Sequence, residues 1–93
     1  MNKYMISYDL NESGKDYEAL FEAIKKASNG IWCKPCKSTW LIQSYCQTTT
    51  ALYEILEKAI DANDFIVIAK IDGTVYGIME KSIADYIGKH FNG

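Results

Sequence analysis

The sequence contains no arginine, one proline and one histidine, and its 93 residues carry a net charge of only −2 at pH 7. All ten basic residues are lysines. Arginine is the side chain that reads guanine through two hydrogen bonds and clamps phosphate in a plane, so its absence argues against sequence-specific DNA reading. The weak net charge also gives no strong attraction toward nucleic acid. A local patch of lysines that holds phosphate backbones remains compatible with this composition.

Long hydrophobic runs are also missing. No apolar run approaches the roughly 20 residues that a membrane helix needs, and the N-terminal stretch reads as a strand rather than a signal peptide. Three cysteines, an odd number, without an export signal suggest free thiols. We therefore expect a cytoplasmic protein with no membrane partner. With 48% hydrophobic and 24% charged residues, residues 1–93 are expected to form a single domain.

The hydrophobic pattern predicts short elements that alternate in type. The order β-α-β-β-α-β is that of the ferredoxin-like split βαβ arrangement. The predicted fold class is therefore α+β, a ferredoxin-like βαββαβ sandwich with a short C-terminal strand and helix. The expected elements, in chain order, are strand 3–8, helix 16–28, two strands within 30–45, helix 48–62, strand 64–71, strand 74–79 and helix 81–91.

Local signals refine this prediction. Pro35 cannot donate a hydrogen bond to a neighbouring strand, so its strand is expected at a sheet edge. The continuous apolar run 65–69 predicts a strand that is buried on both faces. Ser13 and Asp16 predict a capping box at the start of the first helix. Asp72-Gly73 is typical of a hairpin turn, after which 74–79 would return as a strand.

An open sheet face is the main consequence of the predicted fold. Two helices would cover one face and leave the other bare. A bare face that carries Ile66 and Ile68 would be an exposed apolar patch. A two-fold homodimer is the economical way to cover it, with the two sheets stacked face to face or joined along their edges.

Asp9 is the candidate functional residue because it closes the first predicted strand just where the chain turns. A carboxylate there could hold a metal ion or organise a symmetric interface. One carboxylate cannot hold Mg²⁺ tightly, but two copies across a two-fold axis could share an ion with waters and a substrate phosphate. The alternative is a turn-forming aspartate that bonds its own backbone.

Cys33 and Cys36 form a C-x-x-C pattern, which is typical of redox pairs and zinc half-sites. Redox pairs of this kind usually open a helix, whereas this pattern lies in a strand or turn. In an extended strand the two α-carbons would stand about 10 Å apart, at roughly 3.3 Å per residue, and a disulfide spans at most about 7 Å. A zinc site would need two more ligands, and only Cys46 and His90 remain. We expect small edge or surface residues.

Aromatic and lysine side chains give a further, weaker signal. Strand aromatics could stack bases, although core and dimer packing is the simpler use. Four lysines could form a shallow basic edge for a phosphate backbone, and the interleaved Glu18 and Glu22 favour an ordinary solvated face. The aromatic residues concerned are Trp32, Trp40, Tyr45 and Tyr76, and the lysines are Lys25, Lys26, Lys34 and Lys37.

Three stretches in a fixed order carry a family resemblance. Ser7-Tyr8-Asp9-Leu10 ends the first strand, Lys37-Ser38-Thr39-Trp40-Leu41 opens a later strand, and 64–71 follows the second helix. Together they resemble the small CRISPR-associated Cas-two family, and more closely its stand-alone Cas-two-like relatives, the SinR-family proteins. The resemblance covers roughly residues 3 to 90.

The resemblance implies a ferredoxin-like homodimer in which Asp9 lies near the two-fold axis. It implies a role in prokaryotic defence as a metal-dependent endonuclease on RNA or DNA, with Asp9 as catalytic residue and Mg²⁺ ligand. It also leaves room for a non-catalytic dimeric adaptor with a protein partner. The missing arginine and the stretch 72–91 favour the stand-alone relatives over the DNA-integration scaffold.

Overall fold

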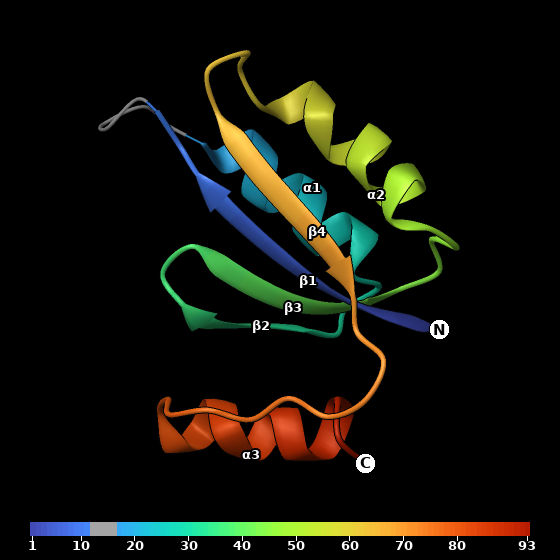
Figure 1. The fold of residues 1–93 in the computed structure, drawn as a ribbon, viewed down its shortest axis with the longest axis vertical. Helices are drawn as coiled ribbons and strands as arrows, with labels where there is room; N and C mark the ends of the chain where they lie inside the picture. The colour runs from blue at the N-terminus through green and yellow to red at the C-terminus, as the bar shows by residue number, and fades with distance from the viewer. Residues whose placement is uncertain (12–16) are drawn as a thin grey trace.

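Figure 1 shows the computed structural model of the chain, which describes residues 1–11 and 17–93. The predicted capping box, Ser13 and Asp16, lies outside the described residues. The described part is an α+β domain in which a four-stranded antiparallel sheet packs with helices on both faces. The elements are β1 (Asn2–Asp9), α1 (Glu18–Ala27), β2 (Trp32–Cys36), β3 (Thr39–Ser44), α2 (Thr49–Leu56), a 3₁₀ turn η1 (Glu57–Ala59), β4 (Phe65–Lys70) and α3 (Lys81–His90).

The strands lie in the order β2-β3-β1-β4, so β2 and β4 are the two edges. The prediction that Pro35 lies at a sheet edge is confirmed, and the pairing of β2 with β3 is irregular between Cys33 and Cys36. On the other side of β1, the register places Asp9 opposite Phe65 and Ser7 opposite Val67. The end of β1 therefore lies beside the start of β4.

Helices α1 and α2 cover one face of the sheet and form the main core with it. Each helix buries two apolar residues one turn apart, which is the spacing that predicted them from the sequence. The Thr48 side chain caps α2 by accepting a hydrogen bond from the Ala51 N–H at 3.0 Å. Each fully buried Leu or Ile stabilises the fold by about 1.5–3 kcal/mol. The buried residues of this core are Tyr4, Ile6, Tyr8, Tyr17, Leu20, Ile24, Trp40, Ile42, Leu52 and Leu56.

The prediction that β4 is buried on both faces is wrong. Ile66 and Ile68 pack against the main core under the helices, whereas Phe65 is 71% exposed and Val67 is 62% exposed on the opposite face. The expectation that Ile66 and Ile68 would form the exposed patch is therefore wrong as well. A continuous apolar run does not tell which face of an edge strand remains uncovered, because that depends on the elements that pack over it.

Helix α3 packs on the second face, so the prediction that this face is wholly open is wrong. Ile87 and Phe91 pack against Leu41 and Cys33 in a second apolar cluster. In Figure 1, α3 lies on the side of the sheet away from α1 and α2, next to β2 and β3. Lys3 Nζ donates a hydrogen bond to the Phe91 carbonyl at 2.9 Å, which ties the end of α3 to β1. Beside β4 on this face, no described residue covers Phe65 and Val67, which remain exposed.

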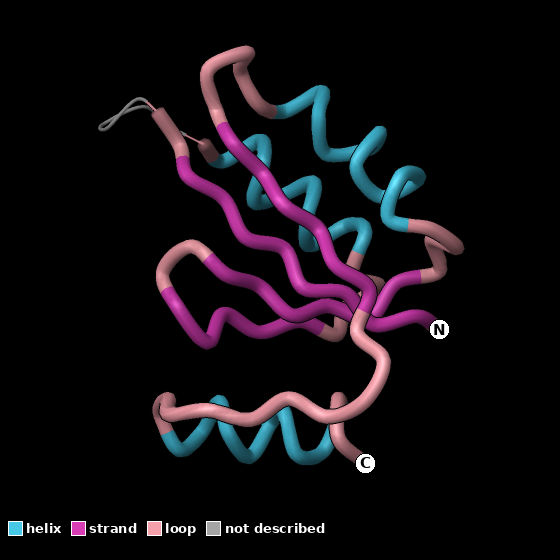
Figure 2. Tube along the Cα trace, viewed as in Figure 1, coloured by secondary structure: helices cyan, strands magenta, loops and turns pink. Residues whose placement is uncertain are grey.

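The predicted C-terminal helix is confirmed, but the predicted strand over 74–79 does not form. This segment runs as an extended loop along α3 (Figure 2). The Asn92 side chain accepts a hydrogen bond from the Val75 N–H at 2.8 Å and donates one to the Val75 carbonyl at 2.9 Å. The chain does not fold back at Asp72-Gly73 as a hairpin, because it crosses to the second face. No helix among the described residues is long and apolar enough to pass through a lipid bilayer.

Candidate functional site

Asp9 is the last residue of β1 and its side chain is exposed. Side chains alternate along a strand, so Asp9 and Ser7 project from the same face, the one that α3 covers only in part. They share a shallow hollow of about 170 Å³ with Phe65 and Val67. We call these four residues the open patch. The structure thus brings the predicted site residue onto an exposed apolar surface.

The Asp9 carboxylate has no recorded hydrogen bond or ion pair with any residue in the described part of the chain. Another carboxylate, that of Asp64, bonds the backbone of Asn11, two residues after Asp9. Asp64 Oδ1 accepts hydrogen bonds from the Asn11 N–H at 2.9 Å and from the Tyr17 hydroxyl at 3.0 Å, and Oδ2 accepts one from the Asp61 N–H at 2.8 Å. Asp64 is a buried residue that sequence reasoning missed, and it makes bonds of the kind that the turn-forming alternative expects of Asp9. The sequence signal that could have pointed to Asp64 is its position directly before the apolar strand β4.

Within the described part of the chain, Asp9 has too few neighbouring ligands to hold a metal ion tightly. Across residues 1–11 and 17–93, no group of three or more His, Cys, Asp or Glu side chains could hold an ion. Ser7 supplies a second oxygen on the same face, and its Oγ lies 3.4 Å from Thr39 Oγ1. His90 packs on the ring of Tyr86 within α3, with ring centroids 4.3 Å apart. The described residues therefore offer a carboxylate and a hydroxyl on this face, both of which are hard oxygen donors.

The three cysteines are free. Cys33 is buried beneath α3, and this burial raises the pKa of its thiol from 9.0 to about 11. Cys36 is exposed at the end of β2. The two thiols of the C-x-x-C pattern therefore lie in different environments, one inside the second apolar cluster and one in solvent.

Two tryptophans and two lysines meet at the outer edge of the sheet. Trp32 of β2 and Trp40 of β3 have ring centroids 4.9 Å apart, and Phe21 of α1 lies 6.0 Å from Trp40. Lys34 Nζ is 5.2 Å from the centre of the Phe21 ring and 5.3 Å from that of Trp40. Lys25 Nζ lies 5.3 Å over the Trp32 ring. We call these five residues the aromatic–lysine edge.

The two tryptophans differ in exposure. Trp40 is buried, as the core-packing interpretation predicts, and its indole Nε1 donates a hydrogen bond to the Tyr8 hydroxyl at 3.0 Å. Trp32 is only partly buried. Lys25 and Lys34 are not simply solvated, because their ammonium groups rest on aromatic rings. The sequence does not predict these lysine–aromatic contacts, because they join residues of α1 and β2, which come together only in the folded chain.

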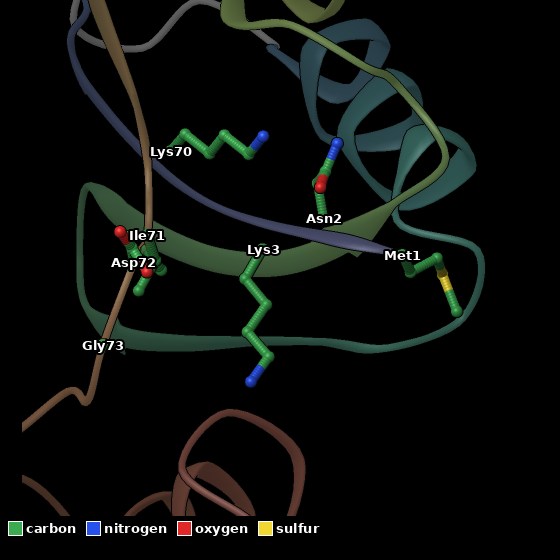
Figure 3. A pocket seen from close by; sticks show the side chains of 7 residues that line it. All are labelled: Met1, Asn2, Lys3, Lys70, Ile71, Asp72 and Gly73. Carbon is green, nitrogen blue, oxygen red and sulfur yellow. The ribbon is translucent and has the colours of Figure 1, made fainter.

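A further hollow, of about 650 Å³, lies where β1 begins and β4 ends (Figure 3). The side chains of its two lysines point in different directions and not toward a common point. Lys3 points toward α3, where it bonds the Phe91 carbonyl, and Lys70 points away from it. We assign this hollow no function. Its lining residues are Met1, Asn2, Lys3, Lys70, Ile71, Asp72 and Gly73.

Comparison of the chain with protein-family models and with curated proteins finds no match in either case.

Proposed function

We propose that this protein is a Cas-two-like homodimer with a ferredoxin-like fold, and that it acts in prokaryotic defence as a metal-dependent nuclease on RNA or DNA through Asp9. The fold assignment is supported by the order β-α-β-β-α-β, with α1 and α2 together on one face. It is also supported by the central place of β1 between β3 and β4.

The observation that carries the proposal is the open patch. Phe65 and Val67 expose large apolar side chains beside Asp9 on an otherwise uncovered part of the sheet. Exposed apolar patches of this kind mark interaction surfaces. A two-fold axis through the patch covers it with the same patch of a second copy. Because Asp9 belongs to the patch, the same axis brings two Asp9 carboxylates close together.

The donor set of such a dimer fits a hard divalent cation. Two Asp9 carboxylates and two Ser7 hydroxyls present oxygen ligands, and waters and a substrate phosphate would complete the coordination. Bound Mg²⁺ supplies Lewis-acid chemistry, which polarises a phosphodiester and makes a bound water more acidic. Asp9 and Ser7 of the two copies would hold the ion, and the apolar rim of Phe65 and Val67 would exclude bulk water from it.

A nuclease assay tests the proposal directly. Purified protein is incubated with single-stranded RNA and with duplex DNA in Mg²⁺ or Mn²⁺, and Asp9→Ala and Asp9→Asn variants are compared with the unaltered chain. Asp72→Ala is the matched control, since Asp72 is an exposed aspartate outside the open patch. We expect cleavage to fall at least about 100-fold in both Asp9 variants and to stay within about twofold in the control. Undiminished cleavage by the Asp9→Ala variant would refute the proposed role of Asp9.

A non-catalytic dimeric adaptor is the second candidate, and one observation favours it. Tyr76 and Ile78 are fully exposed on the extended segment 74–79, which we call the arm. Within the described part of the chain, the arm's only recorded backbone partner is Asn92, which bonds Val75. An unpaired extended segment is a template for addition to a strand of another chain. A stable dimer that shows no cleavage with either metal would favour the adaptor over the nuclease.

A further inference from the structure

We propose that the aromatic–lysine edge binds single-stranded nucleic acid by stacking a base on Trp32 and pairing lysines with the adjoining phosphates. The inference rests on the proposed function for its biological setting and on the geometry of the edge for its ligand. The surface is separate from Asp9, since it is built from α1, β2 and β3 on the helix-covered face of the sheet. The edge is therefore proposed to hold the nucleic-acid strand, whereas cleavage would take place at Asp9.

Trp32 provides the stacking surface. Its ring rests against Trp40, it is only partly buried, and it belongs to the edge strand β2. The Lys25 ammonium group lies over this ring, in a position that a base would take. Stacking of a base on an aromatic ring is stronger than an exposed cation–π contact, so an arriving base displaces Lys25. The displaced ammonium group then lies beside the phosphate of the same nucleotide.

Lys34 provides a fixed positive charge. Its ammonium group lies over both Phe21 and Trp40, and the residue is partly buried. A lysine whose ammonium group contacts two rings loses less side-chain freedom on binding than a free surface lysine does. It therefore presents a pre-positioned partner for a phosphate next to the stacking surface.

The local charge favours an anionic ligand although the whole chain is acidic. Residues 18 to 38 contain four lysines against two glutamates, whereas the chain as a whole carries a net charge of −2. Glu22 lies 3.9 Å from Lys25 and is the acidic group nearest to it in the recorded ion pairs. An acidic peptide would satisfy the lysines but would leave the Trp32 face without a planar partner. Single-stranded nucleic acid supplies both groups, and the absence of arginine predicts binding with little sequence preference.

Tryptophan fluorescence tests the inference on the full chain. Short oligo(dT) and oligo(U) are titrated without divalent metal, so that no cleavage occurs. We expect quenching of Trp32, because Trp40 is buried, and binding that weakens with salt. For two to four phosphates the slope of log K against log salt should be about −1.4 to −2.8. An abasic oligonucleotide of the same length serves as the base-free polyanion and should bind at least about tenfold more weakly.

Matched variants distinguish binding at the aromatic–lysine edge from a general effect of positive charge on the protein. Lys25→Gln with Lys34→Gln should weaken binding about tenfold or more, whereas Lys58→Gln with Lys89→Gln removes the same charge from other elements and should change it less than about threefold. Trp32→Leu should abolish the base preference. Trp32→Tyr keeps an aromatic ring and should retain the base preference. It therefore controls for loss of binding through misfolding of a Trp32 variant.

The outcomes distinguish the two proposals. No binding, equal binding of the abasic strand, or equal loss in both lysine pairs would overturn the edge assignment. Asp72→Ala, an exposed position outside both the open patch and the edge, should leave binding unchanged. Binding at the edge without any metal-dependent cleavage would overturn the nuclease function and leave the binding surface standing, whereas Asp9-dependent cleavage without binding at the edge would do the reverse.

Discussion

At the scale of residues, Asp9 and Asp64 lie at the same end of the sheet and have different roles. Asp64 is buried, and its two carboxylate oxygens accept three hydrogen bonds from three segments of the chain. Asp9 is exposed and lies on the open patch. Asp64 is engaged in bonds that hold the fold, whereas among the described residues the exposed Asp9 carboxylate has no such partner.

Asp64→Ala should lower the free energy of unfolding by about 2–3 kcal/mol, because it leaves the buried partners of the carboxylate without an acceptor. Asp64→Asn should cost less, since one oxygen remains to face Asn11 and Tyr17. Urea denaturation measures both changes. Asp9→Ala is the control and should change stability by less than about 0.5 kcal/mol. An Asp64→Ala loss as small as that of the control would contradict the role given to Asp64.

Cys33 should differ from Cys36 in reactivity and in its effect on stability. Burial raises the pKa of Cys33 to about 11, so at pH 8 its thiol stays protonated and should react with iodoacetamide much more slowly than exposed Cys36. Mass spectrometry of timed samples measures the two rates.

The same pKa shift makes the free energy of unfolding depend on pH. The folded state holds the thiol proton more tightly than the unfolded chain does, so this contribution is fully present below pH 9.0 and is lost as pH rises toward about 11. A pH series of unfolding free energies should show the fall in the unaltered chain and in Cys36→Ser, and less of it in Cys33→Ala. An identical profile in Cys33→Ala would refute the assignment.

At the scale of elements, α3 decides how much of the second sheet face remains free. Its apolar side packs on β2 and β3, and its end is tied to the sheet by Lys3 and by Gln43, whose side chain donates a hydrogen bond to the His90 carbonyl. The part of that face beside β4 is left open. The position of α3 therefore leaves Phe65 and Val67 exposed on the part of this face that carries Asp9.

Phe91→Ala should destabilise the fold by about 3–5 kcal/mol, because Phe91 is fully buried against the second face and its removal leaves a cavity. Urea denaturation followed by near-UV circular dichroism measures the loss. Tyr45→Ala removes an aromatic side chain that is largely exposed, and it should change stability by less than about 1 kcal/mol. Equal effects of the two substitutions would show that α3 does not pack as described.

At the scale of the whole molecule, the exposed apolar surface points to self-association. The open patch and the arm expose four large apolar side chains, Phe65, Val67, Tyr76 and Ile78. From typical side-chain areas these amount to roughly 600 Å² per protomer, which approaches the about 800 Å² that one partner of a standard interface buries. In the proposed dimer, the outer edge of β4 in one copy would pair with the extended arm of the other.

Tyr76→Ser with Ile78→Ser should weaken the dimer about 100-fold or more, because each protomer loses two large apolar contacts while its own core is unchanged. Sedimentation velocity over a concentration series measures the dissociation constant. Tyr53→Ser with Ile55→Ser is the matched control, since it makes the same changes at exposed positions of α2. A monomer in the unaltered chain, or equal weakening in both double variants, would refute the arm as an interface.

Much of the architecture was predictable because its signals are local. Apolar or β-branched runs identify β1 and β4, and apolar spacing identifies α1 and α2, although α2 ends at Leu56 rather than near residue 62. Pro35 identifies an edge strand. The position of Asp9 at the end of the first strand follows from the same local pattern. These features depend on neighbours within one or two turns of the chain, which a sequence displays directly.

The tertiary structure alone decided the rest, because those features join residues far apart in the sequence. The bond from the Asn11 N–H to Asp64 spans 53 positions, and the contact of Lys3 with the Phe91 carbonyl spans 88. The exposed face of β4, the loop in place of a strand at 74–79 and the meeting of Lys25 with Trp32 arise in the same way. A local pattern marks Asp9 as a strand end, and only long-range packing leaves its carboxylate exposed beside an apolar patch.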